Sequence, residues 1–345
     1  MAHRERRVKQ ATVIDVAGRA GVSVATAARA LRAEPSVNQD LAERVRAAAA
    51  ELNYVPNIVA RNLRRGSGNT VGCVVGDMLD PYFGEIAESV TVRAEEAHSM
   101  LAIVSNMQRS AKLELDQCRR LWEQRVDGLI IAGGGFDQIT YAKEFEALVK
   151  QITASGVVVV TMSPRLEGVP SFTADNEAVG KLMAEHIVSF GHEHVGIVTG
   201  APRSETTIQR LRGMENALRS AGVQVHVRHA EYFPESGRAA TEQLMTDHPK
   251  VTAILSAADS MAVGAISGVH AVGKRVPQDV SVMGLGHTRL SLYSQPTLTT
   301  VDVHLAAHAR AAADYIAAVV RGREPDEYLP AAPTLVVGAS VDVPP

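Results

Sequence analysis

Short apolar runs alternate with longer amphipathic stretches from Thr70 onward, and this alternation constrains the fold more than any other feature of the chain. The runs have strand length and are apolar on both faces, which is typical of a parallel sheet that helices cover on both sides. The first series has apolar runs at 71–75, 101–104, 128–131 and 157–160, with helical patterns at 82–98, 111–124 and 139–154.

A second series of the same kind follows, so the pattern predicts two similar α/β halves. In open α/β sheets ligands bind at the carboxyl ends of the strands, and two facing halves would therefore enclose a cleft there. The second series predicts strands near 195–199, 223–227, 253–255 and 280–285, and helices near 177–190, 206–220, 237–247 and 260–272.

The first 52 residues have a different pattern, that of short helices. Thr12 and Asp15 have the spacing of a capping box, and a helix of about two turns is expected to follow them. Gly21 interrupts this helix, Ser23 is placed to cap a second helix through Leu31, and Asn38 precedes a third. A helix, a glycine-containing turn and a second helix together predict a helix-turn-helix.

The charge of the chain is distributed unevenly between these two parts. Residues 1–68 contain 12 Lys and Arg but only 6 Asp and Glu, a net charge of +6, whereas residues 69–345 contain 23 and 32, a net charge of −9. A basic head on an acidic body favours a polyanion such as DNA as the partner of the head, and a solvated basic tail is the alternative.

The second predicted helix has the composition of a helix that reads DNA. Small residues would let it lie deep in a major groove, where Val24 and Ala25 could contact thymine methyl groups and Arg29 could reach a guanine or a phosphate. The alternative interpretation is that these Ala and Val side chains belong to a hydrophobic core.

A linker is expected between the head and the body. Pro56 disfavours helix at the residue before it, and 58–63 could form about two helical turns, too few to be stable alone in water. The Gly-Ser-Gly-Asn sequence at 66–69 is typical of a flexible joint. The domain boundary is therefore expected between residues 68 and 69.

Several other classes of protein are disfavoured. Two cysteines, Cys73 and Cys118, are too few for a disulfide scaffold and fit a reducing compartment. The basic N-terminus has no apolar segment of a signal peptide, and no apolar run approaches the roughly 18 residues that span a bilayer. A soluble, cytoplasmic protein is expected.

No catalytic motif stands out. The chain has no Gly-x-Ser-x-Gly sequence, and the three glycines at 133–135 lack the Lys-Ser/Thr ending of a P-loop. His192, His194 and the pair His304 and His308 lack the spacing and partners of a metal site. We therefore expect neither an enzyme nor a bound metal or cofactor; a simple binding protein or enzyme would leave the basic head unused.

Several motifs of the chain resemble the LacI/GalR family of bacterial transcription regulators, and the resemblance covers nearly the whole length. Its strongest blocks are Thr-Val-Ile-Asp-Val-Ala at 12–17, Ala-Gly-Val-Ser at 20–23, Leu-Asn-Tyr-Val-Pro-Asn at 52–57 and Ala-Arg-Asn-Leu at 60–63. Weaker matches in the body include Asp-Pro-Tyr-Phe at 80–83, Arg-Leu-Arg-Gly at 210–213 and Val-Pro-Gln-Asp-Val-Ser at 276–281.

The resemblance implies a three-helix headpiece with a hinge helix over 1–68, followed by a body like the periplasmic binding proteins over 69–345. The body would have an N-subdomain at about 69–169 and 302–333 and a C-subdomain at about 170–301 and 334–345.

The resemblance also implies a homodimer that binds a near-palindromic operator in double-stranded DNA. Leu63 matches a leucine wedged into the central base step, which would kink the duplex. Ala28 stands where many relatives have Ser, which removes one phosphate contact. The implied DNA-binding residues are Thr12, Ser23, Val24, Ala25, Thr26, Arg29, Asn38, Tyr54, Asn57, Ala60 and Leu63.

In the body, the resemblance implies a cleft for a small effector, a sugar or sugar derivative, which controls DNA binding. Aromatic side chains could stack on a sugar face and Arg210 could donate a bidentate pair of hydrogen bonds, although core aromatics and a solvated arginine are the alternatives. The implied effector-binding residues are Tyr82, Phe83, Arg165, Asp175, Arg210, Tyr232, Asp259 and His287.

Two departures from the family pattern bear on the ligand. Ala258 and Gly286 stand where relatives often have polar residues, and at 286 the usual residue is an acid. A pocket with Arg165, Arg210 and His287 but without this acid would favour an anionic ligand, such as a sugar acid. The sequence thus predicts a repressor of carbohydrate or sugar-acid catabolic genes gated by an effector; the alternative is a regulator with a vestigial cleft that a protein co-regulator controls.

Overall fold

The computed structural model describes residues 11–31, 34, 36–55, 69–133, 136 and 139–345. Contacts within the chain divide it into two compact units, residues 1–68 and residues 69–345. Over the described part of the chain, no helix has both the length and the apolar character required to cross a membrane.

The first unit contains three helices, α1 (Val13–Ala20), α2 (Val24–Leu31) and α3 (Gln39–Glu51). The predicted capping box is present: the Asp15 amide donates to Thr12 Oγ1 over 3.3 Å, and the Thr12 amide donates to Asp15 Oδ2 over 2.7 Å. Gly21 ends α1 with a φ of 65°, a left-handed conformation that glycine adopts without steric cost. Small apolar side chains from all three helices form a common core, with Val16 and Val45 fully buried.

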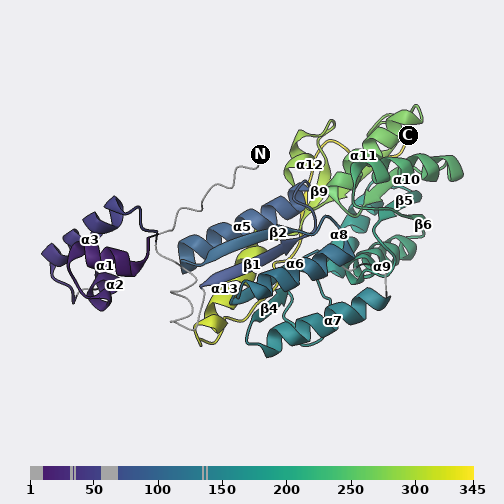
Figure 1. The fold of residues 1–345 in the computed structure, drawn as a ribbon. Helices are drawn as coiled ribbons and strands as arrows, with labels where there is room; N and C mark the ends of the chain where they lie inside the picture. The colour runs from purple at the N-terminus through teal and green to yellow at the C-terminus, as the bar shows by residue number, and fades with distance from the viewer. Residues whose placement is uncertain (1–10, 32–33, 35, 56–68, 134–135, 137–138) are drawn as a thin grey trace, which may run out of the picture. The chain divides into compact units, whose positions relative to one another are not determined.

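The first half of the body is a parallel sheet in the order β2-β1-β3-β4. The strands at 70–75, 128–132 and 158–161 are almost entirely buried because helices cover both faces, as the sequence predicts, whereas the edge strand at 101–106 is only partly buried (Figure 1). The strands are β1 (Thr70–Val75), β2 (Leu101–Asn106), β3 (Gly128–Ala132) and β4 (Val158–Thr161), and the helices are α5 (Pro81–His98), α6 (Ala111–Glu123) and α7 (Ile139–Ala154).

The second half has a larger sheet in the order β10-β9-β8-β7-β5-β6, parallel except for β10 at its edge. Helices α8 and α9 pack together, as do α10 and α11. The strands are β5 (His194–Thr199), β6 (Gln224–His229), β7 (Ala253–Ser256), β8 (Ser281–Leu285), β9 (Thr299–Asp302) and β10 (Thr334–Val336), and the helices are α8 (Asn176–Ser189), α9 (Glu205–Ser220), α10 (Pro234–Asp247), α11 (Asp259–Ala271) and α12 (Arg289–Tyr293).

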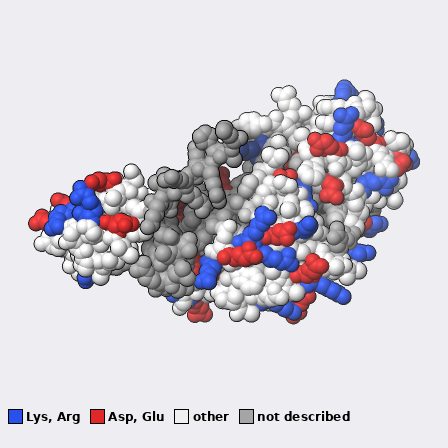
Figure 2. Space-filling model, viewed as in Figure 1, with Lys and Arg blue, Asp and Glu red and all other residues white. Residues whose placement is uncertain are grey.

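The chain passes between the two halves more than once. Helix α13 (Leu305–Val320) follows β9 of the second sheet, yet it packs on α5, β3 and β4 of the first half. The chain then returns to the second sheet, where β10 pairs antiparallel with β9. This exchange interlaces the halves, and the carboxyl ends of β1 and β3 come close to those of β5 and β7. Acidic and basic side chains intermingle on the visible face of the body, without a large patch of one sign (Figure 2).

Candidate functional site

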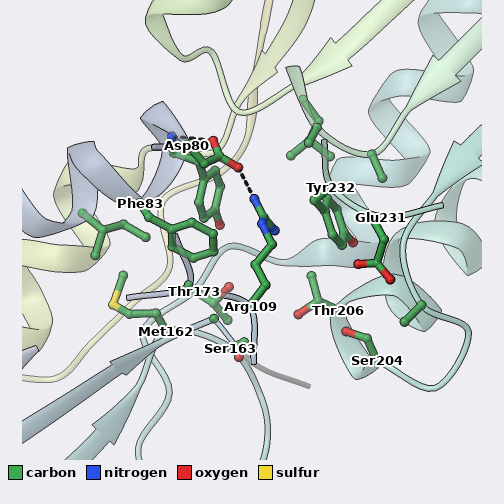
Figure 3. Close-up of a pocket in the computed structure, with 18 of the residues that line it drawn as sticks. Asp80, Phe83, Arg109, Met162, Ser163, Thr173, Ser204, Thr206, Glu231 and Tyr232 are labelled. Atoms are coloured by element: carbon green, nitrogen blue, oxygen red, sulfur yellow. Dashed lines mark hydrogen bonds and ion pairs between the residues drawn. The ribbon is translucent and has the colours of Figure 1, made fainter. Parts of the chain in front are cut away.

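A cavity of about 420 Å³ lies at the carboxyl ends of the strands, with a lining drawn from both halves of the body. Its described lining combines aromatic rings with hydroxyl groups and with charged groups of both signs (Figure 3). The aromatic residues are Tyr82, Phe83, Phe136 and Tyr232; the hydroxyl-bearing residues are Ser163, Thr173, Ser204 and Thr206; and the charged residues are Asp80, Arg109, Arg210 and Glu231.

Arg210 on α9 is a buried cation that lines the cavity from the second half. Its Nε donates to Asn176 Oδ1 over 2.8 Å, and its Nη1 donates to the Ala257 carbonyl over 3.1 Å. Burial raises the pKa of the Tyr82 hydroxyl, and the nearby guanidinium of Arg210 opposes this rise. Over the described residues no carboxylate forms an ion pair with Arg210, so hydrogen bonds to neutral groups hold this charge in the lining.

The position of Arg210 depends on a close crossing of α8 and α9. A Cβ on Gly180 of α8 would lie 2.1 Å from the Arg210 carbonyl oxygen, and a Cβ on Gly213 of α9 would lie 2.1 Å from the Glu177 carbonyl oxygen. Both separations are far below van der Waals contact, so the two helices can approach this closely only with glycine at these positions.

Asp80 and Arg109 form an ion pair that lines the cavity from the first half. Asp80 caps α5 by accepting the Tyr82 amide over 3.0 Å, and its other oxygen accepts from Arg109 Nη2 over 2.6 Å. Burial raises the pKa of Asp80, and the arginine opposes this by favouring the carboxylate. Asp80 belongs to the Asp-Pro-Tyr-Phe motif at 80–83, but the sequence predicts neither Asp80 nor Arg109 as a contact. The feature of the sequence that could have identified Arg109 is its position in the segment that follows strand β2 of the first half.

The structure brings half of the predicted effector residues together. Tyr82, Phe83, Arg210 and Tyr232 line the cavity. Arg165, Asp175, Asp259 and His287 do not belong to its described lining, and for three of them the structure shows another role.

Arg165 forms a buried ion pair instead of facing the cavity. Its Nη1 lies 2.6 Å from Glu114 Oε1, its guanidinium lies 3.7 Å from the centre of the Phe145 ring, and Tyr141 hydrogen-bonds to both members of the pair. Burial raises the pKa of Glu114, and Arg165 opposes this. Arg165 also donates to the Gly133 carbonyl over 3.2 Å, and through this bond it supports a residue that does line the cavity.

The two predicted aspartates are occupied by the fold. Asp175 caps α8, where its Oδ1 accepts the amides of Glu177 and Ala178. Asp259 is 1% exposed and accepts three hydrogen bonds, from the Thr288 amide and hydroxyl and from the Thr300 hydroxyl. Burial raises the pKa of Asp259, and these hydrogen bonds oppose the rise by favouring the carboxylate.

The structure also gives a reason why position 286 is occupied by glycine rather than by an acidic residue. Its φ is +125°, and a Cβ there would lie 3.5 Å from Asp259 Oδ2 and 3.6 Å from the Tyr82 ring. An acid at 286 would therefore adopt a strained backbone beside a second buried carboxylate.

The second helix of the head presents the predicted reading face to solvent. Val24, Ala25 and Arg29 are exposed, whereas Ala27 and Ala30 are buried in the core. The alternative that Val24 and Ala25 are core residues is therefore wrong, because the core face of α2 is formed by other positions. Thr26 is half-buried and its hydroxyl lies 2.8 Å from that of Ser23.

The remaining described residues of the predicted DNA-binding set lie at helix ends. Thr12 caps α1, Asn38 caps α3 by accepting the Asp40 amide, and Tyr54 follows α3 and packs partly against the head core. Asn57, Ala60 and Leu63 lie outside the described residues. Among the described residues, no group of His, Cys, Asp and Glu has the geometry of a metal site.

Two family models match the chain. The model for bacterial regulatory proteins of the lacI family matches residues 12–57, and the model for periplasmic binding proteins and the sugar-binding domain of the LacI family matches residues 68–331. The second match alone covers more than half of the chain. It includes the described residues that line the cavity, and the first includes α1, α2 and α3.

Characterised relatives and solved structures agree with these matches. The chain is 29% identical to the transcriptional repressor CytR of Escherichia coli (strain K12) over 84% of each protein, and 31% identical to the repressor PurR of Pectobacterium carotovorum (strain PC1) over 84% of this chain and 85% of that one. A lac repressor dimer bound to operator and the anti-inducer ONPF has a TM-score of 0.83 and 28% identity, over 97% of this chain and 100% of that chain. These relatives are regulators rather than enzymes, and this chain belongs to the LacI family of bacterial regulatory proteins.

Proposed function

We propose that the protein is a transcriptional repressor whose operator affinity is controlled by a small effector in the cavity of the body. The observation that carries this proposal is that one chain combines an exposed reading face on α2 with a cavity whose lining comes from both halves of the body. A ligand that contacts both halves can change their relative arrangement, because it stabilises whichever arrangement it binds more tightly. We expect the protein to act as a dimer in the cytoplasm, on a near-palindromic operator.

The lining supports a ring-shaped ligand with many hydroxyl groups, a sugar or a sugar derivative. Aromatic rings can stack on the apolar face of such a ligand, and hydroxyl, carboxylate and guanidinium groups can exchange hydrogen bonds with its edge. The preference for an anionic ligand loses much of its support. Two of the three cations on which it rested, Arg165 and His287, are not part of the described lining, and the four charged residues that do line it, Asp80, Arg109, Arg210 and Glu231, balance in sign. Arg210 remains as a donor to a ligand oxygen.

The effector is tested by thermal unfolding of the full chain with neutral sugars, sugar acids and sugar phosphates. A ligand at about 100 times its dissociation constant stabilises the folded protein by roughly 2.7 kcal/mol. Arg210→Gln should abolish the stabilisation, and Arg212→Gln is the matched control because that side chain lies on the same helix but is 55% exposed. If no ligand stabilises the folded wild-type protein, the proposal of a protein co-regulator replaces that of a small effector.

The DNA-binding role is tested on an operator selected from random duplexes. Arg29→Ala should weaken binding to this operator, whereas Arg46→Ala, at an exposed position of α3, is the control. If Arg29 neutralises a phosphate, the slope of log K against log salt should fall by roughly 0.9 in the variant. If both variants bind like wild type, the assignment of α2 as the reading helix is refuted.

A further inference from the structure

Arg109 reaches the cavity through an unusual turn after β2. Gln108 and Arg109 have φ values of 50° and 51°, a left-handed conformation that costs non-glycine residues free energy. Asn106 Oδ1 accepts the Gln108 amide over 3.0 Å, and the Gly76 carbonyl accepts the Arg109 amide over 2.8 Å. These hydrogen bonds thus maintain the strained turn. The turn places the Arg109 side chain between the two halves of the body.

Within the first half, two carboxylates hold the guanidinium of Arg109. Asp80 accepts from its Nη2 over 2.6 Å, and Asp77 Oδ2 lies 3.8 Å from its Nε. Asp80 and Arg109 have side chains only 11% and 14% exposed. Ion pairs with this little exposure are screened weakly by water and salt, so the cation has a defined position.

The same guanidinium contacts the second half. It lies 4.6 Å from the centre of the Phe233 ring and 5.9 Å from that of Tyr232, distances at which a cation is attracted to an aromatic face. These two residues follow β6 and lead into α10 of the second half. Figure 3 shows Arg109 between Asp80 on one side and Tyr232 on the other. One side chain therefore connects the two halves directly across the cavity.

We propose that Arg109 is a specificity-determining residue of the effector site, which holds the two halves together and thereby determines which ligands the cavity admits. This inference rests on the proposed function in one respect, namely that the cavity binds an effector. Arg109 Nε has no hydrogen-bond partner among the described residues. A ligand oxygen that accepts from Nε can keep the halves together, whereas a ligand that displaces the guanidinium from Phe233 separates them.

The contact between halves can be measured without any effector. Spin labels on Ala142→Cys in α7 and Asn216→Cys in α9 report the distance between the halves, since both positions are exposed. Cys73 and Cys118 stay in place because they are buried. The labelled full chain is diluted with unlabelled chain, so that distances within one chain dominate the signal.

Arg109→Gln and Phe233→Leu should each lower the ratio of closed to open chains about 5- to 30-fold, the range expected for loss of a desolvated cation–π contact. Arg119→Gln is the matched control, because that arginine lies on α6 with its side chain 46% exposed. Phe233→Leu preserves an apolar side chain, and it decides the question if Arg109→Gln does not fold. Distance distributions identical to wild type in the folded variants would overturn the proposal.

The ligand screen distinguishes this outcome from failure of the proposed function. A changed distance distribution in protein that no ligand stabilises would support the contact of Arg109 across the halves and refute the small effector. A ligand that stabilises the wild type while Arg109→Gln and Phe233→Leu leave the distances unchanged would support the effector and overturn the role of Arg109.

Discussion

Replacing Arg165 by Met should destabilise the body strongly, although Arg165 does not line the cavity. Arg165 and Glu114 form a two-point ion pair of 2.6 and 3.0 Å, with side chains 6% and 0% exposed. Removing one partner of a buried pair leaves the other charge without compensation, which costs about 3–5 kcal/mol. A typical protein has only about 5–15 kcal/mol of stability, so the loss would be a large fraction of the total.

The loss should depend on pH in a defined direction. Burial already raises the pKa of Glu114 and Arg165 opposes this, so removal of Arg165 raises that pKa further. A folded-state pKa above the unfolded value means that the folded chain binds more protons between the two values. The stability of the variant therefore falls as pH rises through that window. The deficit relative to wild type should be larger at pH 8 than at pH 5.

Urea unfolding of the full chain measures this deficit, and the chain offers a matched control. Lys150 and Glu146 also form an ion pair at 2.6 Å, but their side chains are 74% and 49% exposed. Lys150→Met should therefore cost less than about 1 kcal/mol. Glu114→Leu combined with Arg165→Met should recover part of the loss, because no buried charge remains although the Tyr141 hydroxyl loses both partners. The reasoning is refuted if Arg165→Met is no less stable than Lys150→Met, or if the double variant is as unstable as the single one.

Three further predictions concern other parts of the chain. Thr12→Ala removes the cap of α1 and should destabilise that helix by about 1 kcal/mol, measured by amide hydrogen exchange in α1. Gly180→Ala places a Cβ 2.1 Å from the Arg210 carbonyl oxygen, so it should cost at least about 1–3 kcal/mol in urea unfolding; a neutral effect would contradict the close crossing of α8 and α9. Hydrogen bonds from Arg275 lower the pKa of Asp279 to about 2. Its contribution to stability should be complete above the unfolded pKa of about 4 and lost as pH falls toward 2, and an NMR titration that gives an ordinary pKa for Asp279 would refute the pairing.

The effector site shows where prediction from sequence ends. Tyr82 and Arg210 could be found from the sequence because each belongs to a motif of the family. Tyr82 lies in Asp-Pro-Tyr-Phe at the beginning of a predicted helix, and Arg210 lies in Arg-Leu-Arg-Gly within another. Arg165 and Asp259 are charged residues that the sequence offers as ligand contacts in the same way, yet Glu114 neutralises Arg165 in an ion pair and Thr288 and Thr300 donate hydrogen bonds to Asp259. Whether a charged side chain faces a cavity or a buried partner depends on residues remote in the sequence.

The amino-acid sequence by itself determined the alternation of strands and helices up to about residue 285, the two α/β halves and the separate basic head. These follow from hydrophobic periodicity and capping residues, which act over a few neighbouring positions. The family resemblance already assigned residues 302–333 to the first half, whereas only the tertiary structure showed that Arg109 reaches Phe233 of the second. Such contacts join segments far apart in the chain, and their partners are selected by packing and charge compensation in three dimensions rather than by any local pattern.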